Sequence, residues 1–281
     1  EDLLEAEELD DTEVDGKPVE AWLSAMEADL AARDNVTIRV RTVAAGVYDH
    51  GYVLADERVA DHTPGDGRPK HRLWRIRTAK VINAAGAIER PLSFAGNDIP
   101  GVMLAGALRD YVVNYGVSPG DRTVVVTNND SAYQTALVLK AAGLDVPAVL
   151  DARASATAAL PEAARKAGIR VITGHGIAKV KGGKRVTGVS VCAQAGEGSV
   201  TEEIGCDAVA MSGGWSPVVH LWSHCGGKLT WDEVISAFVP DATRPPLNHD
   251  GSAMVEVVGA AAGDLDLSGK PSAIPPVWVM P

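Results

Sequence analysis

The feature that most constrains the fold is a strand–turn–helix–strand pattern between residues 123 and 151. Three valines follow Thr123, and a polar turn then leads into a helical run of small and aliphatic residues over 131–142. A second apolar run after this helix ends at Asp151. This order and length are typical of a βαβ unit, in which two parallel strands lie side by side. Strand-like and helix-like segments keep alternating over residues 161–211, so the sequence predicts an α/β fold with a parallel sheet.

Hydrophobic periodicity predicts further elements on both sides of this unit. Residues 19–33 carry apolar side chains at helical spacing, and residues 36–43 are interpreted as the strand that follows. Extended patterns over residues 48–57 and 72–82 enclose a tip rich in Gly, Pro and Asp, which indicates antiparallel strands beside the parallel sheet. A last apolar run, residues 254–258, predicts a strand that ends in a Gly/Ala cluster.

Composition excludes several classes of function. The net charge is −11, with 37 acidic and 26 basic residues, so the chain repels nucleic-acid phosphates and anionic membranes. No run of about 18 apolar residues predicts a membrane-spanning helix. The start of the sequence lacks the basic and apolar regions of a signal peptide. Three cysteines without a C-x-x-C pair suggest neither a disulfide framework nor a zinc ribbon, and we expect a cytoplasmic protein without nucleic-acid or membrane partners.

The turn after the first strand of the βαβ unit lies where dinucleotide-binding proteins carry three glycines. Asn128, Asp130 and Tyr133 occupy those positions here. An aspartate about 5 Å from a phosphate charge costs roughly 3 kcal/mol at an effective dielectric constant near 20. Asp151 ends the next strand, where an acid would meet a ribose hydroxyl. We interpret this cradle as a structural remnant with Asp130 as the helix N-cap, and an NAD-binding cradle is the alternative.

Three longer stretches resemble known families. Residues 82–103, INAAGAIERPLSFAGNDIPGVM, are similar to two-domain flavin and pyridine-nucleotide oxidoreductases. Residues 104–137, LAGALRDYVVNYGVSPGDRTVVVTNNDSAYQTAL, and residues 213–240, GGWSPVVHLWSHCGGKLTWDEVISAFVP, resemble the alpha subunits of heterotetrameric sarcosine oxidases. Weaker similarity extends over nearly the whole chain. The chain departs from that family at Ile88, where the family usually has His, and it looks shorter over residues 263–271.

The resemblance implies an α/β fold with two Rossmann-like, FAD/NAD-binding three-layer units. The first unit would comprise residues 1–96 and 213–281, and the second, inserted unit would comprise residues 97–212. The first unit would be incomplete at its N-terminus, because the family's Gly-rich strand–turn–helix lies upstream of Glu1. The family's folate-binding part lies beyond Pro281, so the chain is identified as an internal piece of such a subunit.

The resemblance also implies an oxidoreductase that acts on CH–NH donors. The complete enzyme would demethylate sarcosine to glycine with O2 and tetrahydrofolate. Its alpha subunit would hold NAD, whereas FAD and FMN would belong mainly to the beta subunit, and gamma and delta subunits would be further partners. This chain would be the NAD-holding scaffold. No Ser-His-Asp or paired-carboxylate pattern is present, so no catalytic residue is assigned and the chain alone is expected to be inactive.

By the same resemblance, a nucleotide would lie beside six residues of the first unit. The chain after the strand at residues 36–43 would touch the adenine, and the Gly/Ala cluster would lie along the other side. Flavin-binding relatives usually have Asp at the position of Ala260, whose methyl group therefore favours a non-flavin occupant. Tight strand-to-helix packing is the alternative interpretation of that cluster. The expected cofactor-binding residues are Ala44, Gly86, Gly259, Ala260, Leu265 and Leu267.

Histidines and cysteines do not combine into a convincing metal site. His220, His224 and Cys225 have one-turn helical spacing, but a fourth ligand is missing. We therefore predict that no metal is bound. Cys192 and Cys206 fall in apolar, strand-like surroundings, which predicts buried core thiols.

Three other functions remain open. A self-sufficient NAD(P)H-dependent flavin oxidoreductase would need a C-x-x-C pair or an intact nucleotide fingerprint, and neither is present. A subunit of a related amine or opine dehydrogenase would resemble this chain at its beginning and its end. Residues 97–114, NDIPGVMLAGALRDYVVN, nevertheless favour the sarcosine oxidase family. An interaction module without a cofactor is the third possibility.

Overall fold

A computed structural model describes residues 13–63, 65, 67–194 and 198–265. Contacts within the chain divide it into two compact bodies. The smaller body holds the described residues of 1–46 and 52–77, and the larger body holds residues 47–51 and those described from 78 onward. None of the described helices has the length and apolar character that crossing a membrane requires.

The smaller body contains one helix and an antiparallel sheet. The predicted helix is present as α2 (Val19–Ala31), which follows the short strands β1 (Glu13–Val14) and β2 (Lys17–Pro18). Three strands form the sheet in the order β3–β4–β5, and their meander confirms the predicted antiparallel strands. They are β3 (Thr42–Tyr48), β4 (Tyr52–Arg58) and β5 (His71–Arg77).

The predicted strand at residues 36–43 is wrong in its position. The strand begins only at Thr42 and continues to Tyr48, so that Ala44 lies inside it rather than after it. Ile38 and Val40 fit the alternating sequence pattern of a strand, but both side chains are exposed. A segment becomes a strand only when a neighbour accepts and donates its backbone hydrogen bonds, and no described strand pairs with these residues.

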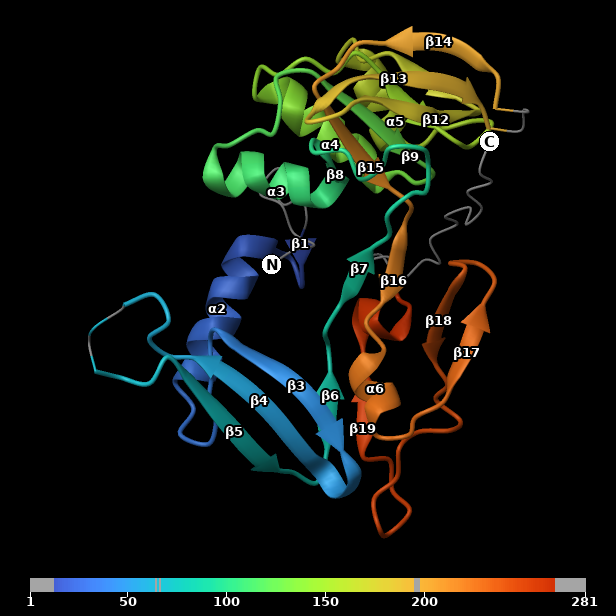
Figure 1. Cartoon of the computed structure of the whole chain (residues 1–281). Coiled ribbons are helices and arrows are strands. Elements are labelled where there is room, and N and C mark those ends of the chain that lie inside the picture. The colour runs from blue at the N-terminus through green and yellow to red at the C-terminus, as the bar shows by residue number, and fades with distance from the viewer. Residues whose placement is uncertain (1–12, 64, 66, 195–197, 266–281) are drawn as a thin grey trace. The chain divides into compact units, whose positions relative to one another are not determined.

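The larger body is organised around a parallel sheet of five strands in the order β11–β10–β9–β15–β8 (Figure 1). Every neighbouring pair in this sheet is parallel. Helix α4 (Ser131–Ala141) connects β9 to β10, which confirms the predicted βαβ unit. The strands are β8 (Val102–Leu104), β9 (Thr123–Thr127), β10 (Val149–Asp151), β11 (Val171–Thr173) and β15 (Ala208–Ser212).

Alternating side chains of this sheet face two different layers. In β9, Val125 packs against the helices, whereas Val124 and Val126 pack against a second, antiparallel sheet. A strand that is buried on both faces consists of consecutive apolar residues. The helical layer contains α3 (Ala105–Tyr115), α4 and α5 (Ala159–Lys166), and the opposite layer contains β12 (His175–Gly182), β13 (Val186–Ala193) and β14 (Val200–Ile204).

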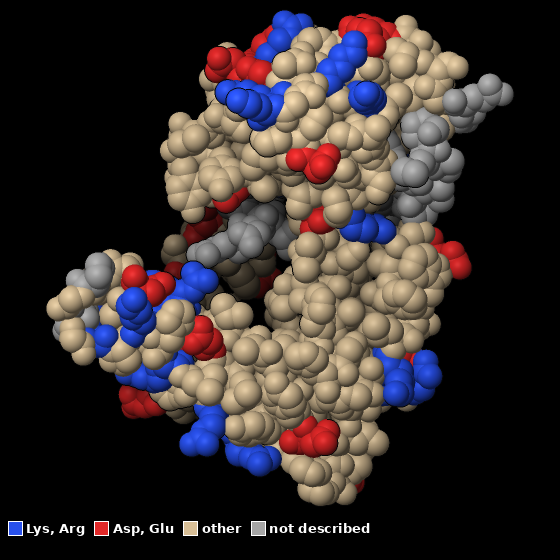
Figure 2. All heavy atoms as spheres, in the orientation of Figure 1, with Lys and Arg blue, Asp and Glu red and all other residues tan. Residues whose placement is uncertain are grey.

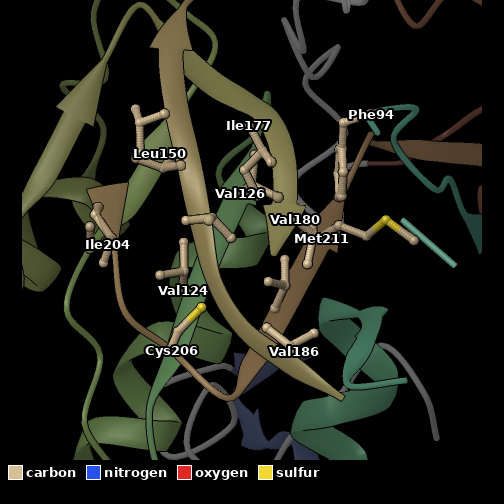
Figure 3. Close-up of a cluster of buried hydrophobic side chains, with 14 of the residues drawn as sticks. Phe94, Val124, Val126, Leu150, Ile177, Val180, Val186, Ile204, Cys206 and Met211 are labelled. Atoms are coloured by element: carbon tan, nitrogen blue, oxygen red, sulfur yellow. The ribbon is translucent and has the colours of Figure 1, made fainter. Parts of the chain in front are cut away.

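The core between the two sheets is the larger of the two hydrophobic clusters (Figure 3). Val126 and Leu150 of the parallel sheet meet Ile177 and Val180 of the antiparallel sheet there. Cys206 belongs to this cluster, and Cys192 is also fully buried, so both predicted core thiols are confirmed. The three layers confirm the predicted Rossmann-like α/β fold class.

The rest of the larger body consists of paired short strands. β6 (Val81–Asn83) and β19 (Val255–Val257) are parallel neighbours, and β19 confirms the strand predicted at residues 254–258. β7 (Ala87–Glu89) pairs antiparallel with β16 (Trp215–Pro217). The sequence did not predict the hairpin of β17 (Leu229–Asp232) and β18 (Ala237–Pro240). Two short helices, α6 (His220–His224) and η2 (Gly259–Ala262), complete this part.

Truncation of the inter-sheet core should be costly. Leu150 is fully buried in this core, and Leu→Ala substitutions in such positions cost about 2–5 kcal/mol because they leave a cavity. We expect Leu150→Ala to lower the free energy of unfolding by that amount in urea denaturation. The control is Leu247→Ala in the same body, because Leu247 is exposed. Equal losses in the two variants would contradict the layer assignment.

Candidate functional site

The turn between β9 and α4 is filled by its own side chains. Asn129 donates from Nδ2 to the Ser212 Oγ atom at 3.0 Å, and its Oδ1 atom accepts the Ser131 backbone N–H at 3.1 Å. The hydroxyl of Thr127 donates to the carbonyl of Asn129 at 3.1 Å. Asn128 and Asn129 are both buried. The turn therefore uses its polar groups internally, where a phosphate-binding loop would leave backbone N–H groups open.

The acid at the end of β10 is also engaged. Asp151 is 0% exposed, and its Oδ2 atom accepts the Tyr133 hydroxyl at 2.6 Å. Arg153 donates to both oxygens of Asp151, with Nε to Oδ1 at 3.0 Å and Nη2 to Oδ2 at 2.7 Å. The same Nη2 reaches Oδ1 of Asp130 at 2.7 Å. One guanidinium thus joins the two acids that the sequence places on either side of the cradle.

Burial and hydrogen bonding shift the pKa values of Tyr133 and Arg153. Burial first, and then the hydrogen bond to Asp151, raise the pKa of Tyr133 above its usual range. Burial alone would lower the pKa of Arg153, but its hydrogen bonds to Asp151 and Asp130 raise it. Tyr133 and Arg153 therefore both stay protonated at neutral pH, and the ion pair persists.

These contacts decide whether the cradle formed by the ends of β9 and β10, called here the second cradle, fits a dinucleotide. A ribose would have to displace Tyr133 and Arg153 from a fully buried Asp151. A pyrophosphate would have to approach Asp130. The residues present do not fit the group. Asp130 occupies the predicted N-cap position of α4, but its side chain makes no capping hydrogen bond. Its carboxylate bonds Arg153 instead, and the Oδ1 atom of Asn129 accepts the Ser131 N–H in the first turn.

A second edge of parallel strands lies at the carboxyl ends of β6 and β19. Asn83 joins the two strands at this edge, because its backbone carbonyl accepts the Val258 N–H at 3.0 Å. The Asn83 side chain accepts the Ala85 N–H at 3.2 Å and donates to the Val218 carbonyl at 3.4 Å. The carbonyl of Gly86 accepts the Val218 N–H at 3.0 Å. The chain after β6 is thus tied to the chain after β16.

Two of the predicted cofactor-binding glycines follow the strands of this edge, Gly86 after β6 and Gly259 after β19. Gly86 has φ +74° and Gly259 has φ +61°, a left-handed conformation that glycine adopts readily. A Cβ atom added at either position would meet nothing within 4 Å. Open space over two backbone turns at the carboxyl ends of parallel strands is the geometry by which α/β proteins bind nucleotides. The residues of this edge therefore fit a nucleotide, unlike those of the second cradle.

Ala260 and Asp264 change the interpretation of this edge. The side chain of Ala260 is buried, so its methyl group packs inside the protein rather than along an open surface. Asp264 is exposed, and its N–H donates to the carbonyl of Gly259 at 3.2 Å. Asp264 is not among the cofactor-binding residues predicted from the sequence. The sequence did contain a signal for it. Flavin-binding relatives usually have Gly-Asp where this chain has Gly259-Ala260, and the same Gly-Asp order occurs here four residues later, at Gly263-Asp264.

The remaining predicted positions are more scattered. Ala44 lies in β3 and belongs to the smaller body. Leu265 is partly buried and follows η2, whereas Leu267 lies outside the described residues. Which of the predicted positions touch a cofactor stays a prediction.

The histidines and the cysteine considered as metal ligands have separate surroundings. His224 stacks on Tyr48 with ring centroids 6.0 Å apart. The Cys225 thiol donates to the carbonyl of Leu221 at 3.2 Å. Within residues 13–265, as far as they are described, no three metal-ligating side chains come together.

The antiparallel strands β7 and β16 carry a buried acid where the chain enters the five-stranded sheet. The Oε2 atom of Glu89 accepts the N–H of Gly106, in the first turn of α3, at 2.8 Å. Burial raises the pKa of Glu89, while hydrogen bonding with Ser212 and Gly106 and the charge of Arg109 oppose that rise. This carboxyl therefore serves the start of α3.

The chain is similar to subunits of two kinds of oxidase. A sarcosine oxidase alpha subunit from Corynebacterium sp. (strain P-1) is 39% identical over 96% of this chain and 31% of the relative. The one from Rhizobium meliloti (strain 1021) is 40% identical over 92% of this chain and 25% of the relative. An opine oxidase subunit of the latter organism is 26% identical over 62% of this chain and 42% of the relative. The chain thus spans between a quarter and a third of the sarcosine oxidase subunits that it matches.

Solved structures share the fold. The L-proline dehydrogenase from P. horikoshii matches with a TM-score of 0.59 and 21% identity, over 89% of this chain and 41% of that protein's chain. Thioredoxin reductase from T. acidophilum also reaches a TM-score of 0.59, with 18% identity over 91% of this chain and 75% of its own. No model of a protein family matches the sequence. At these identities the structural likeness establishes the fold alone.

The ion pair between Arg153 and Asp151 should contribute strongly to the free energy of unfolding. Replacement of Arg153 by Met leaves the buried carboxylate of Asp151 without its cation, and breaking a buried pair in this way costs about 3–5 kcal/mol. Arg170→Met is the matched control, because the ion pair of Arg170 with Glu202 is exposed and exposed pairs contribute little to stability. Urea denaturation should show a much larger loss for Arg153→Met, and similar losses would argue against a sealed cluster.

Glu89 gives the fold a defined pH dependence. Its pKa is raised above the ordinary 4.5, so its contribution to stability is fully present below that value and is lost as pH rises through the raised pKa. Gln keeps an acceptor for the Gly106 N–H without titrating. We expect the free energy of unfolding of the native chain, relative to Glu89→Gln, to fall over this window in urea titrations from pH about 4 to about 8. A difference that is independent of pH would refute this assignment.

Proposed function

Since the chain is homologous to a stretch of the sarcosine oxidase alpha subunits, we propose that it is the NAD-holding scaffold part of such a protein. The observation that carries this proposal is the identity of 39–40% over more than nine tenths of the chain. The complete enzyme would oxidatively demethylate sarcosine to glycine in the cytoplasm, with O2 and tetrahydrofolate. FAD and FMN would be held mainly by the beta subunit, and gamma and delta subunits would complete the assembly.

The proposed domain division falls at β7 and β16, the two strands that precede and follow the five-stranded sheet in the chain. Residues 97–212 would form an inserted nucleotide-binding-like unit, and residues 1–96 and 213–281 would form the unit that binds NAD. The five-stranded sheet is built entirely within residues 102–212, and β7 and β16, which precede and follow it in the chain, pair with each other. Both facts support an insertion with one entry and one exit.

Within this division, NAD would lie along the edge formed by β6 and β19. Gly86 and Gly259 would let the backbone approach the nucleotide, and the exposed carboxylate of Asp264 would accept hydrogen bonds from a ribose hydroxyl. Bound NAD could in general accept a hydride, but residues 83–86 and 258–263 carry no titratable side chain. The adjacent acid, Asp264, would be engaged by the ribose and not by the nicotinamide ring. The role of the nucleotide would therefore be structural, and this chain alone would be inactive.

The alternative functions are less well supported. The similarity to the opine oxidase subunit is lower in identity and covers less of the chain. A flavin-dependent disulfide-type reductase would need a reactive thiol. Burial raises the pKa of Cys206 to about 11, and burial also raises the pKa values of Cys192 and Cys225. These three thiols stay protonated at neutral pH, which favours the scaffold role.

The choice between the two cradles can be tested in the complete alpha subunit, purified with its partner subunits. Gly259→Val and Asp264→Ala should each weaken NAD binding about tenfold, which corresponds to a loss of about 1.4 kcal/mol of binding free energy, and should therefore lower the content of bound NAD. Asp130→Asn, in the second cradle, should leave the NAD content unchanged. NAD released by denaturation is measured enzymatically. A loss of NAD in Asp130→Asn, with none in the other two variants, would reverse the assignment.

A further inference from the structure

An open groove of about 420 Å³ lies on the larger body. Strands β7 and β16 form one side, and the hairpin of β17 and β18 forms the other. Its lining is mostly apolar and includes Ile88, Pro91, Pro217, Trp231 and Phe238. The proposed nucleotide scaffold uses none of these side chains.

The hairpin side of the groove presents two aromatic rings to solvent. Trp231 is 46% exposed and Phe238 is 54% exposed, and the rings meet edge to face with centroids 5.1 Å apart. Ile88, on the opposite side, is 53% exposed. The whole sequence has only two Phe and six Trp residues, so an exposed aromatic pair beside aliphatic side chains marks a binding surface rather than random exposure.

The two sides of the groove are held in place without an occupant. Arg90 follows β7, and its guanidinium donates to the carbonyls of Ser236 and Ile235 in the hairpin turn, each at 2.9 Å. Arg90 also exchanges backbone hydrogen bonds with Gly213 and Gly214, just before β16, at 2.7 and 2.8 Å. A groove with fixed sides loses little conformational freedom when a ligand binds.

Charge around the groove favours an uncharged ligand. Glu89 is turned toward Gly106, and the Nη atoms of Arg90 are occupied by backbone carbonyls. On the face shown in Figure 2, charged side chains border the surface over β16–β18 rather than cover it. The groove thus suits an apolar segment that brings no charge of its own.

We propose that residues 274–280 of this chain, IPPVWVM, bind in the groove. The described chain leaves η2 close by, because a Cβ atom added at Gly263 would lie 2.7 Å from Cγ1 of Val239. Val239 follows Phe238 in β18, so its side chain points to the opposite face of the hairpin and the chain has to pass around the hairpin to reach the groove. Eight residues lie between Leu265 and Ile274, and the nine steps from one to the other, at up to about 3.3–3.6 Å each, can span about 30 Å. The segment can therefore reach the groove.

The chemistry of the segment matches that of the groove. Residues 274–280 contain no charged side chain. Consecutive prolines at 275 and 276 favour an extended polyproline II conformation, which aromatic-lined grooves bind with little loss of entropy. Trp278 and the aliphatic side chains of the segment would cover Trp231 and Phe238, which removes apolar surface of both partners from water.

Hydrogen exchange of the full chain tests the proposal from both partners. Replacement of Val277 and Trp278 by Ser should speed exchange of the hairpin amides, residues 229–240, several-fold. The reciprocal replacement of Trp231 and Phe238 by Ser should speed exchange in residues 274–280. Lys270→Ser is the matched control, since it lies in the same stretch but outside the segment, and it should change neither. Hairpin exchange that is unchanged in the first variant overturns the proposal.

A photo-crosslinking residue in place of Trp278 identifies the occupant directly. At low protein concentration we expect crosslinks within one chain to residues 88–91 or 229–240, mapped by mass spectrometry. Crosslinks elsewhere in the chain overturn the proposal. Crosslinks to a second copy, or in the assembled complex to another subunit, would overturn it as well and would assign the segment to an intermolecular contact instead.

Discussion

The larger body depends on the division of apolar side chains between the two faces of its parallel sheet. Val125 turns to the helices, while Val124 and Val126 turn to the antiparallel sheet. Both layers are needed to remove this sheet from water, because a parallel sheet with one bare face would expose a continuous row of aliphatic side chains. The carboxyl ends of the strands are thereby fixed at one edge, and the chemistry of that edge is set by the few residues that follow each strand.

In the part of the chain that the structure describes, two edges of parallel strands differ in how far their own side chains fill them. After β9 and β10, a guanidinium joins Asp130 and Asp151, and a phenol completes the hydrogen bonding of the buried carboxylate. The members of this cluster thus satisfy one another's hydrogen bonds. After β6 and β19, two glycines in left-handed conformation face open space. The residues that follow the strands thus leave one edge closed by its own side chains and the other edge with open backbone turns.

The strands β7 and β16 connect these two parts of the larger body. Glu89 contacts the start of α3 on one side, and Arg90 contacts the hairpin of β17 and β18 on the other. Adjacent residues at the end of one short strand therefore position both the sheet that follows and the apolar groove. The proposed scaffold role would use surfaces of this kind, because a scaffold would hold a cofactor and neighbouring segments in place.

The sequence by itself determined the βαβ unit, most strands of the parallel sheet, the core thiols and the likeness to an oxidase subunit. These depend on local periodicity and on long similar stretches. It did not reveal the cation of Arg153 in the cradle, the nearness of Asp264 to Gly259, the hairpin with its aromatic pair, or the true start of β3 at Thr42. Each of these depends on which residues become neighbours once the chain is folded. Hydrogen bonds and burial between such residues form only in the folded chain, so only the tertiary structure decided which cradle is closed and which is open.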